Sequence, residues 1–156
     1  MSVHPARVVA SLALLAGGFI VGVSVLAILL AKVLVDAGMT IRPADAALLG
    51  DLVPVMPFVG GFAVASLIAG VGVLAGQARA DSIAMGTSIV AVVSGVLGLV
   101  LIAVGRDPFA STSGARSSAD GLEIVGAFTL IYLIVLVAMA ATQTRVSGTT
   151  RRAVAS

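Results

Sequence analysis

The sequence predicts an all-α protein, folded as a four-helix transmembrane up-and-down bundle with a short interfacial helix after the first span. Four long apolar runs fill most of the chain, and none has a charged residue in its middle. A helix rises about 1.5 Å per residue and the bilayer core is about 30 Å thick, so roughly 20 apolar residues span it. Lipid also requires that backbone polar groups be satisfied within the segment, which favours helices. The expected spans are residues 8–31, 53–76, 83–104 and 122–141.

Composition supports one integral membrane domain over residues 1–156. The chain is 60% apolar and 10% charged, whereas about 25% of the residues in a soluble domain are charged. The net charge is +2 and the basic residues are scattered, so the lipid bilayer is the expected partner and nucleic acid is not. The chain has no cysteine, which excludes disulfides, thiolate catalysis and cysteine-ligated metals.

The first span must be distinguished from a cleaved signal peptide. Arg7 precedes the run, as in the charged region of a signal peptide. The apolar part of a signal peptide is about 7–15 residues long, and the run over residues 8–31 is longer. We therefore expect a retained membrane helix. Lys32 and Asp36 lie one turn apart at its far end, where they can form an ion pair.

A short helix is expected over residues 43–52, with a plain loop as the alternative. Pro43 suits the first turn of a helix, and Asp45 suits the positive end of its dipole. Pro54 and Pro57 then fall at the start of the second span. A missing backbone N–H costs little at that place, because the first N–H groups of a helix have no partner within it.

The remaining connections differ in length and polarity. Residues 77–82 make a tight connection in which Asp81 is the expected N-cap of the third span, so spans two and three form an antiparallel hairpin. Residues 105–120 are rich in Ser and Gly and are expected to be mobile. They end at Asp120, which together with Glu123 three residues later has the spacing of a capping box. The basic tail 144–156 is expected to be disordered.

The distribution of Lys and Arg predicts the orientation. The side that holds both termini carries five basic residues, and the other side carries four: Arg7, Arg79, Arg145, Arg151 and Arg152 against Lys32, Arg42, Arg106 and Arg116. Cytoplasmic loops carry the excess of Lys and Arg. We therefore expect a multi-pass protein of the cell membrane with both termini in the cytoplasm.

Small residues four positions apart are the candidates for close helix packing. Such residues form a flat strip that lets helix backbones approach each other in lipid. The glycine candidates are Gly18, Gly22, Gly72, Gly76, Gly95 and Gly98. Two interpretations remain open: an interface in a homo- or hetero-oligomer, or packing among the four helices of this chain, which is favoured. The fourth span contains only Gly126, so larger side chains must pack there.

The spans carry few chemically active residues. His4 is the one histidine and lies outside the spans, so a haem held by two histidines and a zinc site both lack ligands. No base lies near the serines of the spans. We therefore predict no catalytic, cofactor-binding or metal-binding residue, and no enzyme activity. Glu123 and Tyr132 are weak candidates for a role in transport. A helix cap explains Glu123. Tyr132 shares a helix face with Thr129, and two interpretations remain open: a polar strip that lines a small cavity or faces a partner, or one hydroxyl satisfied by a neighbouring backbone carbonyl, which is favoured.

Two hypotheses for function follow. In the first, the protein is a non-catalytic structural or accessory subunit that packs against other membrane proteins through its small-residue faces. In the second, it is a small transporter or permeability-forming protein with a path between its helices. Such a path needs a polar lining, and only scattered Ser and Thr residues, Tyr132 and Gln143 could supply one. The sequence therefore favours the first hypothesis.

Overall fold

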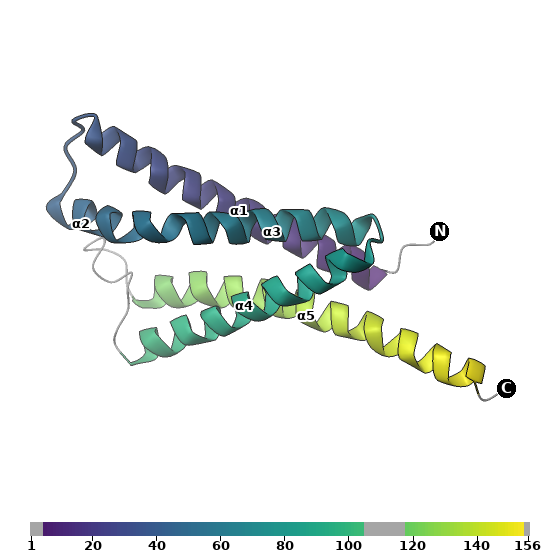
Figure 1. The fold of residues 1–156 in the computed structure, drawn as a ribbon. Helices are drawn as coiled ribbons and strands as arrows, with labels where there is room; N and C mark the ends of the chain where they lie inside the picture. The colour runs from purple at the N-terminus through teal and green to yellow at the C-terminus, as the bar shows by residue number, and fades with distance from the viewer. Residues whose placement is uncertain (1–4, 105–117, 155–156) are drawn as a thin grey trace.

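The computed structural model describes residues 5–104 and 118–154, and this part of the chain is helical apart from short turns. Four helices are long and apolar enough to cross a membrane, which confirms the predicted four-helix bundle. The elements are α1 (Pro5–Asp36), α2 (Pro43–Leu52), the 3-10 turn η1 (Val53–Val55), α3 (Met56–Leu74), α4 (Ala78–Ala103) and α5 (Ser118–Val154) (Figure 1).

The four long helices form a ring. Helix α1 packs against α3 and α5, and α4 packs against the same two helices, so α1 and α4 lie diagonally opposite each other. The chain enters α1 and leaves α5 at the same end of the bundle, called the terminal end below (Figure 1). The opposite end carries α2 and is called the α2 end. Helices α1 and α4 are farthest apart at the α2 end.

The predicted short helix is present, so the loop alternative for residues 43–52 was wrong. Pro43 and Asp45 both lie in its first turn. Pro54 lies in the first turn of η1 and Pro57 in that of α3, where neither removes a hydrogen bond of a helix interior. The predicted pair of Lys32 and Asp36 also forms.

Gly76 has a role in a turn and not in helix packing. Its φ angle is +73°, a left-handed conformation that favours glycine. The Gln77 N–H donates to the Gly72 carbonyl at 2.9 Å, which closes the end of α3. No atom lies within 4 Å of a Cβ built at Gly76. The sequence placed this glycine on a packing strip, but the tight connection needs it.

Three predicted boundaries differ from the structure. Helix α4 begins at Ala78, so Asp81 lies in its first turn and is not the N-cap, although an acidic residue is favourable at both places. Helix α5 begins at Ser118, which puts the predicted cap Asp120 inside the helix. The tail expected to be disordered is helical up to Val154. It contains no proline, and extending an existing helix adds one hydrogen bond per residue. The loop expected to be mobile lies at 105–117, outside the described residues.

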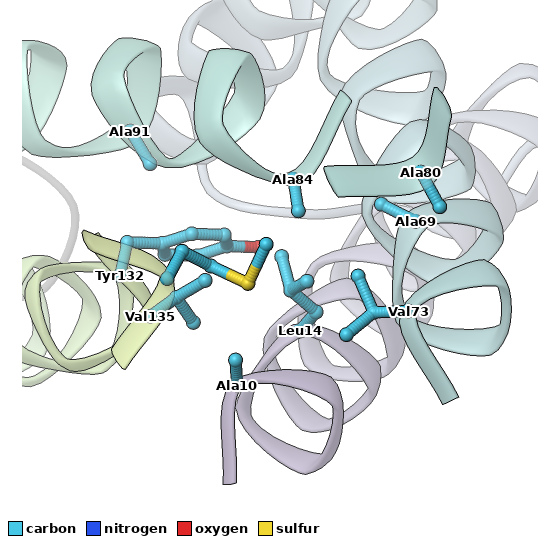
Figure 2. Packing of buried hydrophobic residues seen from close by; sticks show 10 residues of the cluster. Ala10, Leu14, Ala69, Val73, Ala80, Ala84, Ala91, Tyr132 and Val135 are labelled. Carbon is cyan, nitrogen blue, oxygen red and sulfur yellow. The ribbon is translucent and has the colours of Figure 1, made fainter. Parts of the chain in front are cut away.

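The best-packed part of the core lies toward the terminal end. Side chains from all four long helices point toward one another there (Figure 2). Many of them are alanines, which let the helix backbones approach closely. The cluster consists of Ala10, Leu14, Ala69, Val73, Ala80, Ala84, Ala91, Tyr132, Val135 and Met139.

Candidate functional site: an apolar crevice in the bundle

A crevice of about 630 Å³ lies between the four long helices toward the α2 end. It extends along the bundle from Gly17, in the middle of α1, to Met56 at the start of α3 and Ile124 in the first two turns of α5. Exposed side chains such as Ile20 form part of its wall, so the crevice opens to the surroundings of the bundle. The lining residues are Gly17, Ile20, Val21, Ser24, Val25, Ile28, Met56, Val59, Ser94, Gly95, Gly98, Ile124, Val125, Ala127, Phe128 and Ile131.

The lining is almost wholly apolar. Ser24 and Ser94 supply its polar side chains. The hydroxyl of Ser24 donates to the carbonyl of Ile20 in its own helix at 2.9 Å, so its donor is already used. The lining carries no ionisable side chain. A crevice of this kind suits an apolar guest and offers little to replace the water around an ion.

Tyr132 bounds the crevice on the side of the terminal core. It is fully buried, and its ring packs against Phe62 and Phe128 with centroid distances of 5.4 and 4.9 Å. A Cβ built at Gly17 would lie 2.9 Å from its hydroxyl oxygen, so only glycine leaves room there. Gly17 and Phe128 both line the crevice, which places the Tyr132 ring directly behind this lining.

The Tyr132 hydroxyl lies 3.1 Å from the Oγ of Ser66 on α3. The sequence left open a polar strip facing a cavity or a single satisfied hydroxyl. The structure supports the single satisfied hydroxyl. Its partner, however, is a side chain on the diagonally opposite helix α3 and not a backbone carbonyl. Thr129 is satisfied within its own helix, because its Oγ1 donates to the Val125 carbonyl at 2.6 Å.

Two of the predicted packing glycines lie between α4 and α5. A Cβ at Gly95 would overlap Thr129, and one at Gly98 would lie 3.2 Å from Val125. Both glycines also line the crevice. Their absent side chains therefore bring the two helices together and widen the crevice at the same place.

Gly18 and Gly72 also serve contacts within the chain. A Cβ at Gly18 would lie 3.0 Å from the Ala63 carbonyl oxygen of α3, and one at Gly72 would overlap Ala80 of α4. Gly22 is different, because the nearest atom to its Cβ position is 3.9 Å away on Ala63. These contacts support the interpretation that the small-residue strips pack the helices of this chain.

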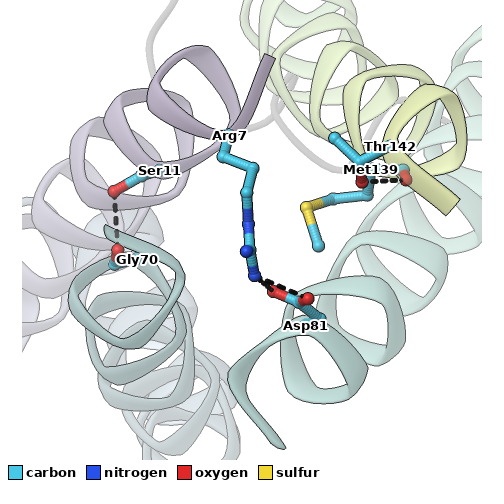
Figure 3. A network of polar contacts seen from close by, with 6 residues as sticks. All are labelled: Arg7, Ser11, Gly70, Asp81, Met139 and Thr142. Atoms are coloured by element: carbon cyan, nitrogen blue, oxygen red, sulfur yellow. Dashed lines mark hydrogen bonds and ion pairs between the residues drawn. The ribbon is translucent and has the colours of Figure 1, made fainter. Parts of the chain in front are cut away.

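An ion pair that the sequence analysis missed lies at the terminal end. Arg7 of α1 reaches across the bundle to Asp81 of α4, with distances of 2.6 and 2.7 Å from one guanidinium nitrogen to the two carboxylate oxygens (Figure 3). The two side chains are 26% and 29% exposed. A weak signal was available, since both residues were expected on the same side of the membrane.

Glu123 does not belong to the crevice lining. It is an exposed residue near the start of α5, next to Ile124, which does line the crevice. The described residues also contain no group of three or more His, Cys, Asp and Glu side chains that could hold a metal ion.

Comparisons with protein-family models, curated proteins and solved structures give no match to this chain.

Proposed function

We propose that the chain is a non-catalytic integral membrane protein that binds the acyl chain of a membrane lipid in the crevice between its helices. The crevice carries this proposal. It is apolar, it is built by all four spans, and it lies at a depth where a bilayer consists of hydrocarbon. Neither of the two weak transport candidates, Glu123 and Tyr132, belongs to its lining.

The volume favours a single extended chain over a partner helix. Small-molecule sites are typically about 300–1,000 Å³, and 630 Å³ falls within this range. A transmembrane helix about 10 Å wide and about 30 Å long occupies roughly 2,400 Å³, several times this volume. A whole transmembrane helix does not fit, whereas a flexible hydrocarbon chain can follow the crevice.

The physical basis of binding is packing and not the hydrophobic effect. Lipid tails are as apolar as the crevice wall, so moving a tail into the crevice removes no apolar surface from water. The gain comes from dispersion contacts with the lining, which are small singly and large together. We therefore expect selection by chain length and shape, with little dependence on the headgroup.

Photocrosslinking tests this proposal. The protein is reconstituted in phosphatidylcholine vesicles that contain a lipid with a diazirine in the middle of its acyl chain. Crosslinks should concentrate on peptides that contain Phe128 and Val25. Ser94→Trp fills the crevice and should reduce these crosslinks to the level of the outer surface. Val90→Trp is the matched control, one turn earlier on the same helix at an exposed position outside the lining. Equal crosslinking in Ser94→Trp and wild type would overturn the proposal.

An accessory subunit is the second candidate function. A groove of about 360 Å³ lies between α1 and α3, with Gly22 and Gly60 among its lining residues. A Cβ built at either glycine would have no heavy atom closer than 3.8 Å. This small-residue surface therefore still has space for contacts with another molecule. A transmembrane helix of another protein could pack there. Extraction in mild detergent at native expression, followed by identification of co-purifying proteins, distinguishes this role from lipid binding alone.

The proposed location is the cell membrane with both termini in the cytoplasm. The basis is the distribution of Lys and Arg, five residues on the side of the termini and four on the other. In this orientation the ion pair of Arg7 and Asp81 lies at the cytoplasmic end and the crevice lies toward the outside. The crevice would then receive lipid from the outer leaflet.

A further inference from the structure

We propose that the crevice selects lipids by the length of the acyl chain, and that Tyr132 and Gly17 set this length by closing the inner end of the crevice. This inference rests on the proposed function, because it names the chains that the acyl-chain site holds best. Binding should strengthen with each added carbon until the chain end reaches Tyr132, and further carbons should add nothing.

The inner end of the crevice is closed by packed side chains. Gly17 and Phe128 line this end. Tyr132 lies directly behind them and is fully buried, with its ring centroid 4.9 Å from that of Phe128. Toward the terminal end, Leu14 and Val135 are also fully buried and belong to the same core cluster as Tyr132 (Figure 2). A chain that enters from the α2 end therefore cannot continue along the bundle past Tyr132.

The Tyr132 ring is held in a fixed position. A Cβ built at Gly17 would lie 2.9 Å from the Tyr132 hydroxyl oxygen, so the ring lies directly against the backbone of α1. The same hydroxyl lies 3.1 Å from the Oγ of Ser66 on α3. A ring held from two helices has little space to move aside. An acyl chain gains only dispersion contacts from the crevice, which are weak singly, so it should not displace the ring.

The depth of the crevice follows from its lining residues on α1. Gly17 and Ile28 are the first and last of these residues and lie eleven positions apart. At a rise of about 1.5 Å per residue, the crevice is about 17 Å deep, or roughly half of the hydrocarbon core. An extended hydrocarbon chain with bond lengths of about 1.5 Å and bond angles of about 111° advances about 1.25 Å per carbon. A chain of about 13 carbons therefore fills the crevice from the α2 end to Gly17.

The open wall of the crevice determines the form of the selection. Exposed lining residues such as Ile20 leave the crevice open at the side, so a longer chain can bend out into the surrounding lipid. Such a chain keeps every contact with the lining. A shorter chain leaves the inner end of the crevice without contacts and loses their dispersion energy. Retention should therefore rise with chain length and then stay level.

Competition among lipids of different chain length tests this inference. The protein is reconstituted in nanodiscs with equal amounts of didecanoyl, dilauroyl, dimyristoyl, dipalmitoyl and distearoyl phosphatidylcholine, which share one headgroup. Native mass spectrometry identifies the retained lipid by its mass, and each signal is divided by the share of that lipid in the nanodisc. We expect retention to rise severalfold from the decanoyl to the myristoyl lipid and to stay level up to the stearoyl lipid.

Val21→Phe shortens the crevice from its inner end. Val21 lines the crevice one turn from Gly17 on the side of the α2 end, so a phenylalanine there removes about 5 Å of depth, or about four carbons. The decanoyl, lauroyl and myristoyl lipids should then be retained equally. Val23→Phe is the matched control, because Val23 lies on the same helix at an exposed position outside the crevice lining. It should keep the wild-type profile.

Two results would overturn the selection by length. Retention that keeps rising from the myristoyl to the stearoyl lipid would show that the crevice does not end at Tyr132. A wild-type profile in Val21→Phe would show that the inner end does not set the length. Should Val21→Phe lose helix content by circular dichroism, Ser24→Phe at an exposed lining position must shift the profile in the same direction. Loss of every lipid from the wild type would contradict lipid binding itself, whereas equal retention of all five lipids would contradict only the selection.

Discussion

The hydroxyl of Tyr132 on α5 lies 3.1 Å from the Oγ of Ser66 on α3, and this contact joins two diagonally opposite helices inside the bundle. Tyr132 is fully buried between Phe62 and Phe128. On one side of its ring lies the lining of the apolar crevice, and on the other lies the alanine-rich core. The stability of the bundle should therefore depend strongly on this side chain.

Tyr132→Phe should destabilise the bundle by about 1 kcal/mol, because it removes one hydrogen bond and keeps the ring. Tyr132→Ala should cost about 3–5 kcal/mol, because it also leaves a cavity in the core. Unfolding in mixed micelles of increasing dodecyl sulfate content measures both. Ser66→Ala should add little in the Tyr132→Phe background. Fully additive effects of these two changes would show that the two hydroxyls do not interact.

Gly95→Ala should destabilise the bundle by about 1–3 kcal/mol, since the added Cβ overlaps Thr129 and forces α4 and α5 apart. Gly86→Ala is the matched control on the same helix, with no atom within 4 Å of the new Cβ. It should be neutral or stabilise by up to about 1 kcal/mol, because alanine is the better helix former. The same unfolding assay applies, and equal effects at the two glycines would contradict the close packing of α4 on α5.

Most of the fold could be predicted from the sequence, because apolar length and turn chemistry are local signals. The four spans, the short helix after Pro43 and the pair of Lys32 with Asp36 depend only on residues close together in the chain. The pair of Arg7 and Asp81 joins residues 74 positions apart, so its partners could not be recognised before the helices were placed. The position of Asp81 could also be explained without an ion pair, because an acidic residue is favourable at any helix start.

The crevice could not be predicted, because it depends on how the four long helices are placed relative to one another. Its lining residues are the same aliphatic types that face lipid elsewhere on the spans. The small-residue candidates were identified, but their partners were not. Gly18 and Gly95 pack within the chain, whereas Gly76 closes a turn. Gly17 was missed, since only the position of Tyr132 shows that a side chain would not fit there.

Gly18→Leu should lower the stability of the bundle far more than Glu123→Gln. A leucine at position 18 meets the backbone of Ala63 and holds α1 and α3 apart. Glu123 is exposed near a helix start, where its loss costs about 1 kcal/mol or less. Thermal unfolding in detergent compares the two variants. If Glu123→Gln abolished lipid crosslinking with the fold intact, a proton-linked role for this residue would replace the present account.

Both termini should be accessible from the cytoplasm. Val3→Cys and Thr150→Cys, made one at a time in the cysteine-free chain, are labelled with a membrane-impermeant maleimide in intact cells and in inverted vesicles. Both should react only in inverted vesicles, because four spans return the chain to its starting side. Labelling of the two positions from opposite sides would contradict the even number of spans.

The most direct test of lipid binding in the crevice is native mass spectrometry of the protein released from lipid nanodiscs. The account predicts that the wild type keeps one lipid under collision energies that strip loosely held lipids. Ser94→Trp, which fills the crevice, should release the protein without that lipid, and Val90→Trp should keep it. Loss of all lipid from the wild type, or an equally retained lipid in Ser94→Trp, would contradict the assignment of the crevice as an acyl-chain site.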